Sequence, residues 1–255
     1  MNDTPSAARG ARLISLDEVG STNAEAFARA RAGERGPLWI TARRQTAGRG
    51  RRGRTWVSEP GNLYASLLLT DPAPAQRAAE LSLVAALAVH DALAERAAVL
   101  GTRLTLKWPN DVLCDGAKVS GILVEGEGLP ARPLAVVIGI GVNCAHHPAD
   151  TAYPATNLAA AGALVTPESL AQALVGTMAR RLAEWDAAKN FAGIRAGWLK
   201  RAAGLGASAR VRLPEREVEG IAETLDEAGR LVLRLADGSC ERIAAGEMFP
   251  LSVRA

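Results

Sequence analysis

Residues 103–125 read RLTLKWPNDVLCDGAKVSGILVE, and their pattern places β-strands in the middle of the chain. Polar and apolar residues alternate from Arg103 to Trp108, and the runs Val112–Cys114 and Lys118–Glu125 flank the dipeptide Asp115-Gly116. Alternation with period two is typical of strands, and Asp-Gly between two such runs is a strong hairpin signal. We therefore predict that this stretch forms neighbouring strands of a sheet.

The flanking sequence adds both strands and helices to this sheet. Further strands are expected at residues 12–19, 38–42, 63–70 and 134–142. Helices are expected from Ser21-Thr22 to Gly33, over Gln76–Leu100, over Pro167–Lys189 and over Phe191–Arg201. Ser21 and Thr166 are good N-cap residues, and Pro167 suits a first helical position. The mixture predicts an α+β fold.

A different pattern begins after Leu205-Gly206. Short alternating segments follow one another and are separated by Gly-containing or Pro-containing turns: Ala209–Leu213, Glu217–Thr224, Arg230–Leu235 and Ser239–Ile243. About 50 residues of short strands predict a small barrel. We therefore divide the chain into a larger domain, residues 1–205, and a small C-terminal domain, residues 206–255.

Composition excludes several classes of protein. The 255 residues include 30 Lys+Arg and 27 Asp+Glu, a net charge of +3, while 48% are hydrophobic and 22% charged. Six arginines and no acid lie within residues 43–54, so the remainder sums to 3 − 6 = −3. That distribution is unlike the spread basic face of a non-specific duplex binder. No apolar run is long enough to span a membrane, residues 1–12 lack a signal-peptide core, and the three cysteines lack metal-ligand spacing. We expect a reduced, cytoplasmic protein.

The basic window overlaps an unusual glycine-rich segment, residues 45–56, which reads QTAGRGRRGRTW. Glycines let backbone amides approach a ligand closely, and arginines bind anions through forked donors, so the segment suits phosphate or carboxylate. It is not a GxxxxGK[ST] phosphate loop. A solvated basic loop that contacts nucleic acid is the alternative, and Trp56 is either a stacking surface or a packing residue.

Two lysine-containing segments are further candidates. Lys107-Trp108-Pro109-Asn110-Asp111 directly follows a predicted strand, where its side chains could bind an anion, a metal or an amine; a plain Asx-type turn is the alternative. Lys118 opens the next strand in a chain with only four lysines, and Gly121 in that strand indicates a close approach. The run Ile138–Asn143, IGIGVN, is an apolar strand with two glycines.

Together, the order and spacing of these segments resemble the biotin protein ligase family over about residues 13–250. The resemblance rests on Ser21-Thr22-Asn23, Gln45 to Trp56, Gly61-Asn62-Leu63-Tyr64, Lys107 to Asp111, Lys118 to Glu125 and Gly139 to Asn143. It implies a catalytic domain similar to class II aminoacyl-tRNA synthetases, with a mixed sheet and flanking helices, plus a small SH3-like β-barrel.

The resemblance also implies an activity. Such an enzyme joins biotin and ATP, with Mg²⁺, into biotinyl-5′-AMP, and then transfers biotin to one lysine of a biotin carboxyl carrier protein or carrier domain of a carboxylase. Only about 12 residues precede the first expected strand, so we expect no DNA-binding domain. We expect no membrane partner, and the sequence leaves a homodimer open.

Residue roles implied by the resemblance follow from position. Biotin contacts fall on Ser21, Thr22, Asn23, Gln45, Arg49, Gly50, Arg51, Lys118, Gly121 and Gly139. Nucleotide contacts fall on Arg52, Arg54, Trp56, Asn62 and Asn143. The catalytic residues are Lys118, Arg51, Asp111 and Lys107, and Asp111 is also the candidate metal ligand.

Two rival interpretations remain. A lipoate–protein ligase or octanoyltransferase shares the catalytic fold and also modifies a carrier lysine. An RNA-binding module would use the arginine segment alone, although the net charge of −3 elsewhere and the lack of interleaved aromatic residues disfavour it.

Overall fold

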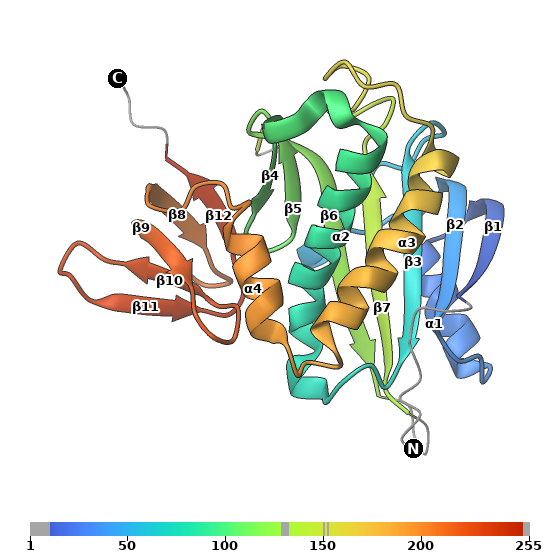
Figure 1. Ribbon diagram of the computed structural model, residues 1–255, viewed down its shortest axis with the longest axis horizontal. Helices are drawn as coiled ribbons and strands as arrows, with labels where there is room; N and C mark the ends of the chain where they lie inside the picture. The colour runs from blue at the N-terminus through green and yellow to red at the C-terminus, as the bar shows by residue number, and fades with distance from the viewer. Residues whose placement is uncertain (1–10, 129–132, 150, 152, 252–255) are drawn as a thin grey trace.

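The computed structural model describes residues 11–128, 133–149, 151 and 153–251, and they form two sheets. The larger is a seven-stranded mixed sheet (Figure 1). In spatial order its strands are β1 (Arg12–Val19), β2 (Leu38–Gln45), β3 (Leu63–Thr70), β7 (Ala135–Val142), β6 (Ala117–Glu127), β5 (Asp111–Cys114) and β4 (Leu104–Lys107). Strands β1 and β2 are parallel, and each other neighbouring pair is antiparallel. The predicted Asp115-Gly116 hairpin joins β5 to β6.

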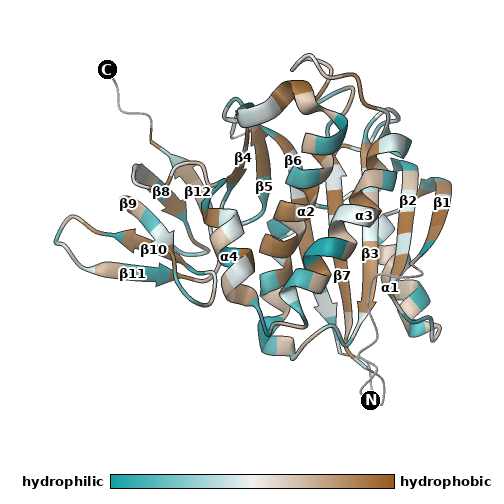
Figure 2. Cartoon of the chain, in the orientation of Figure 1, coloured by the Kyte–Doolittle hydropathy of each residue, from teal (hydrophilic) through white to brown (hydrophobic). Residues whose placement is uncertain are grey.

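Helices cover both faces of this sheet because successive strand residues point to opposite sides. Leu38 and Ile40 of β2 pack with α1 (Thr22–Arg31), whereas Trp39 joins the larger core beneath α2 (Leu81–Arg96) and α3 (Pro167–Trp185). Figure 2 shows that the central strands are predominantly apolar, as burial on both faces requires. None of the described helices is long and apolar enough to cross a membrane.

The two predicted N-cap residues are confirmed. The Ser21 hydroxyl accepts a hydrogen bond from the Ala24 amide, and the Thr166 hydroxyl accepts one from the Ser169 amide at 3.2 Å. Helix α3 ends at Trp185, four residues before its predicted end, because Asp186 adopts a left-handed conformation with φ 48°.

The prediction of one continuous helix over Gln76–Leu100 is wrong. The segment contains a 3₁₀ helix at Ala75–Glu80, then α2, then a second 3₁₀ helix at Ala98–Arg103. Glu80 lies buried where the first piece ends, and its carboxylate accepts a 2.7 Å hydrogen bond from the Trp185 indole of α3. Packing against a distant helix therefore sets this boundary.

Helix α4 (Phe191–Leu199) leads into a five-stranded antiparallel sheet, which lies beside the β4 edge of the large sheet (Figure 1). Its order is β11 (Cys240–Ile243), β10 (Leu231–Arg234), β9 (Glu217–Leu225), β8 (Ser208–Arg212) and β12 (Glu247–Pro250). The first four match the predicted short strands, and β12 was not predicted. Ala202 bridges to Leu106 of β4, and buried residues of both sheets belong to one apolar core.

Candidate active site

A cavity of about 430 Å³ lies on the α1 face of the large sheet, beyond the end of that helix. The structure brings together nearly all predicted site residues in its lining: Ser21, Thr22, Asn23, Gln45, Arg49, Gly50, Arg51, Arg52, Arg54, Trp56, Lys107, Asp111, Lys118, Gly121, Gly139 and Asn143. These residues are distant in sequence, and the antiparallel pairing of β3, β7, β6 and β5 places them on one surface.

Asn62 is the predicted site residue that lies outside this lining. Its side-chain oxygen accepts from the amides of Cys144, Ala145 and His146 at 2.8, 2.9 and 3.2 Å. Its amide nitrogen donates to the His146 carbonyl at 3.0 Å. Asn62 therefore holds the turn after β7, next to Asn143, which does line the cavity.

One end of the cavity is neutral and polar. The side-chain oxygen of Gln45 accepts from the Thr22 amide at 2.8 Å and from the Thr22 hydroxyl at 3.1 Å. The Gln45 amide nitrogen donates to the Ser58 hydroxyl at 2.9 Å, which orients the side chain. Thr22 sits here because Ser21 caps α1 and aims the first helical turn at the cavity. These groups offer donors and acceptors without net charge.

Asn23 is fixed beside this polar end by two neighbours. Its amide donates to Glu125 of β6 at 2.7 Å, and its oxygen accepts from the buried Ser66 hydroxyl at 2.5 Å. The close approach at Gly139 makes room for this side chain, because a Cβ at that position would overlap the Asn23 amide. The strand glycine thus accommodates a residue that lines the cavity.

Trp56 rests on the sheet in the same way. A Cβ on Gly121 or Gly141 would overlap its ring, and the Lys118 amine lies 5.4 Å from the ring centroid. The buried Trp56 indole N–H has no hydrogen-bond partner among the described residues. The Trp56 ring therefore forms an aromatic surface of the cavity next to the Lys118 amine.

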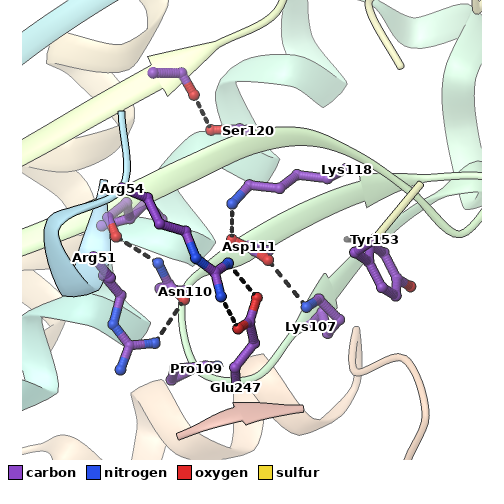
Figure 3. Close-up of polar contacts among 12 residues, drawn as sticks. Arg51, Arg54, Lys107, Pro109, Asn110, Asp111, Lys118, Ser120, Tyr153 and Glu247 are labelled. Atoms are coloured by element: carbon purple, nitrogen blue, oxygen red, sulfur yellow. Dashed lines mark hydrogen bonds and ion pairs between the residues drawn. The ribbon is translucent and has the colours of Figure 1, made fainter. Parts of the chain in front are cut away.

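The opposite end contains a buried carboxylate between two lysines (Figure 3). Lys118 Nζ lies 2.6 Å from Asp111 Oδ1, and Lys107 Nζ lies 3.1 Å from Asp111 Oδ2. Burial raises the pKa of Asp111, but the charges of Lys118 and Lys107 outweigh it and hold that pKa below its usual value. Asp111 is therefore ionised at neutral pH, and the group carries a net positive charge.

The turn between β4 and β5 builds this arrangement. Lys107 and Asp111 face each other as cross-strand partners, with Trp108, Pro109 and Asn110 forming the connection. The Trp108 ring is buried, and its N–H donates to the Gly229 carbonyl of the C-terminal sheet at 3.2 Å. The segment that the sequence singled out is thus anchored at both domains.

Metal binding at Asp111 receives no support from this geometry. Both carboxylate oxygens are already paired with lysines, and the described residues contain no group of three or more His, Cys, Asp or Glu that could hold a metal. The described side chains around Asp111 therefore do not form a metal site.

The arginine segment folds over the cavity as a short ribbon. Arg49 and Thr55 pair across it, the Trp56 amide donates to the Gly48 carbonyl at 2.9 Å, and a 3₁₀ turn spans Arg51–Gly53. Gly53 has φ +71°, a conformation that glycine adopts without strain.

Charge in the cavity is strongly positive. Six cationic side chains line it: Arg49, Arg51, Arg52, Arg54, Lys107 and Lys118. The lining includes two carboxylates, and each is paired, Asp111 with the lysines and Glu247 with Arg54. The cavity therefore suits an anion at this end and a neutral polar group at the other.

Several residues that line the cavity were not predicted from the sequence. Glu247 and Gly246 come from the C-terminal sheet, and no local pattern connects them to residues almost two hundred positions away. Tyr64 and Tyr153 also line the cavity. They are the only tyrosines in the sequence, so their rarity was a usable signal.

Comparison with known proteins identifies the family. Residues 21–143 match the Biotin/lipoate A/B protein ligase family, and residues 205–249 match the biotin protein ligase C terminal domain. The chain is 44% identical over 240 residues to a biotin--[acetyl-CoA-carboxylase] ligase of Paracoccus denitrificans, an alignment covering 92% of this chain and 98% of the relative. The chain belongs to the biotin protein ligase family.

Other members agree with this assignment. The Mycobacterium tuberculosis biotin--[acetyl-CoA-carboxylase] ligase is 36% identical over 94% of this chain and 89% of its own length. The biotin protein ligase of Aquifex aeolicus in complex with biotin and ATP has a TM-score of 0.76 and 29% identity, covering 93% of this chain and 97% of that one. The expected fold, a mixed-sheet catalytic domain with an SH3-like C-terminal domain, is confirmed.

Proposed function

We propose that this chain attaches biotin to a lysine of a biotin carboxyl carrier protein, or of the carrier domain of a carboxylase, with consumption of ATP. One observation carries the proposal: a single cavity joins a neutral polar end to a cationic end. Biotin has a neutral ureido ring and a carboxylate at opposite ends, and ATP adds further anionic groups. The names of the relatives favour biotin over lipoate.

The reaction proposed has two steps. The biotin carboxylate attacks the α-phosphorus of ATP, which forms the acyl–phosphate bond of biotinyl-5′-AMP and releases pyrophosphate. The neutral amine of a carrier lysine then attacks the acyl carbon. The new amide forms, the bond to AMP breaks, and the amine loses its proton to solvent.

The first step brings two anions together, and the cationic end lowers this barrier. Two like unit charges 4 Å apart repel by about 4 kcal/mol at an effective dielectric of 20. Lys118, which lies beside Asp111 and over Trp56, is placed to bind the carboxylate and then the phosphoryl oxygens. Arg51 supplies a further charge from the loop.

The remaining roles are proposals of the same kind. Ser21, Thr22, Asn23 and Gln45 would recognise the ureido ring, with Arg49 and Gly50 completing that set. Arg52, Arg54, Trp56, Asn62 and Asn143 would serve the nucleotide, Asn62 through the turn that it holds. Mg²⁺ would enter as the ATP complex, bound largely by phosphate oxygens.

Three broader predictions also remain proposals. We place the reaction in the cytoplasm, and we propose the division into residues 1–205 and 206–255, which the start of β8 at Ser208 supports. The prediction that the chain binds no DNA remains to be tested by gel shift, where operator-specific retardation would contradict it.

A direct assay tests the proposed function. The chain is mixed with ATP, Mg²⁺, biotin and a carrier domain of acetyl-CoA carboxylase, and mass spectrometry follows the carrier. We expect one lysine to gain biotin, with no modification when lipoate replaces biotin. Modification by lipoate alone, or salt-sensitive RNA binding without any ATP chemistry, would overturn the proposal.

A further inference from the structure

Three arginines of the loop contact the C-terminal sheet, and Arg51 also donates to the Asn110 side chain of the catalytic domain at 3.0 Å. Arg54 Nη1 donates to Glu247 Oε1 at 2.6 Å, and its second terminal nitrogen donates to Glu247 Oε2. Arg52 donates to the Arg212 carbonyl at 3.1 Å, and Arg51 donates to the Gly246 carbonyl at 3.1 Å. The loop therefore bridges the two domains above the cavity.

Glu247 is the carboxylate of its sheet that lines the cavity. Its side chain is 18% exposed and lines the cavity, whereas Glu219, paired with Arg210 at 2.8 Å in the same sheet, is 57% exposed. Burial raises the pKa of Glu247, but the hydrogen bond and the charge of Arg54, together with the charge of Lys107, outweigh it and keep that pKa below its usual value. Glu247 is thus a charged, two-pronged acceptor at neutral pH (Figure 3).

At its base the loop is held by the Trp56 ring, which lies on Gly121 and Gly141, and by the Arg51–Asn110 hydrogen bond, whereas residues 52–54 are exposed. Its 3₁₀ turn buries no residue, and Arg52 within that turn has φ 56°, in the left-handed region that favours glycine. Neighbouring arginines also repel one another: burial lowers the pKa of Arg51 and the charges of Arg52 and Arg54 lower it further, whereas the charges of Asp111 and Glu247 raise it. An acceptor outside the loop offsets both effects.

We propose that Glu247 is a positioning residue, which holds the arginine loop over the cavity before any ligand is bound. Its pairing with Arg54 neutralises one loop charge and orients the ribbon so that Arg49 and Arg51 face the cavity. Ligand then meets a loop that is already in place. A loop that is already in place should also slow the release of biotinyl-5′-AMP, and this consequence rests on the proposed function. The order of the loop in the ligand-free chain does not depend on that function.

Hydrogen–deuterium exchange of the ligand-free, full-length chain tests the proposal. Glu247→Gln should raise the exchange rate of peptides covering residues 46–58 by about fivefold, the range of a partly exposed ion pair. Glu219→Gln, which breaks a pair elsewhere in the same sheet, should leave those peptides unchanged. The double exchange Arg54→Glu with Glu247→Arg should restore slow exchange.

Several outcomes would overturn the proposal. These are unchanged loop exchange in Glu247→Gln, an equal rise in Glu219→Gln, or a charge-swapped chain that stays as open as the single variants. If Glu247→Gln also loosens peptides of β8 and β12, Arg54→Gln decides, because it breaks the pair from the loop side. Unchanged loop exchange in that variant overturns the proposal.

A second readout separates this proposal from the function. With biotin and ATP present, Glu247→Gln should release biotinyl-5′-AMP about fivefold faster, and the charge swap should slow release again. If loop exchange changes as expected but the wild-type chain forms no adenylate, the proposed function fails and the role of Glu247 stands.

Discussion

Lys107 and Lys118 share the Asp111 carboxylate and both line the cavity, yet their side chains differ in exposure. The Lys107 side chain is 2% exposed, and its amine lies 3.2 Å from the Met248 carbonyl and 4.3 Å from the centroid of the Tyr153 ring. Lys118 is 27% exposed and stands over the Trp56 ring. Lys118 is therefore the more accessible of the two cations, and the catalytic role expected of Lys107 stays a prediction.

Lys118→Ala should slow adenylate formation by about 100-fold, the cost of removing one preorganised charged donor. The chain should remain folded because Lys107 still pairs with Asp111. Single-turnover assays with biotin and labelled ATP measure the rate, and Lys189→Ala is the control, since that lysine is 71% exposed and lies beyond the end of α3. An unchanged rate in Lys118→Ala would remove it from the chemistry.

Gly139→Ala should lower the free energy of unfolding by about 1–3 kcal/mol and weaken biotin binding. The added Cβ would overlap Asn23, whose position depends on Ser66 and Glu125. Gly126→Ala is a matched control in the neighbouring strand, where the nearest atom lies 4.0 Å away. Urea unfolding and biotin titration test both variants, and equal effects in the two would contradict the crowding argument.

Elements with a local signal were predicted well, and those set by distant contacts were not. Ser21 and Thr166 indicate where their helices begin, because an N-cap side chain bonds only to an amide in the first turn of its own helix. The break at Glu80 was missed because its partner, Trp185, lies 105 residues away. Strand β12 was missed for a similar reason: four residues without alternation become a strand by pairing with β8.

The residues of the candidate site show the same difference between local signals and distant contacts. Polar and glycine-rich segments at strand ends pointed to the arginine segment and to the two lysine-containing segments, and the resemblance to the biotin protein ligases implied most of the remaining cavity lining. Glu247 is among the lining residues that were missed, because its position depends on how the second sheet lies beside β4. Asn62 shows the converse, since its side chain serves the turn at Cys144–His146.

The turn between β4 and β5 makes stability depend on pH through Asp111. Its pKa is lowered on folding, so the stability it contributes is present above the unfolded value of 3.8 and is lost as the pH falls through the lower folded value. Asp111→Asn should cost about 3 kcal/mol at pH 7, since it leaves Lys107 buried without a counter-charge. Urea unfolding at successive pH values should show a constant gap between wild type and variant down to about pH 4. The gap should narrow below that pH, and a gap that widens on acidification would contradict this account.

On the scale of the whole molecule, the arginine cluster of residues 43–54 lies largely at the cavity between the two sheets, and Glu247 neutralises part of its charge. The loop of residues 45–56 lies between the catalytic sheet and the C-terminal sheet, and the latter supplies Glu247. The site is therefore shared between two parts of the chain that differ in sequence pattern. Binding at this site would strengthen their association, because ligand contacts both.

The two parts should also unfold as one unit, because they share an apolar core and direct polar contacts. Trp108 donates to the Gly229 carbonyl, and Arg195 of α4 donates to the Leu225 carbonyl of β9 at 2.7 Å. Urea unfolding followed by circular dichroism and by exchange of the β8–β12 peptides should therefore give coincident transitions. Trp108→Phe keeps most of the packing and removes one hydrogen bond, so it should shift both transitions together by about 1 kcal/mol. Loss of the C-terminal sheet at lower urea than the large sheet would show instead that the domains are energetically separate.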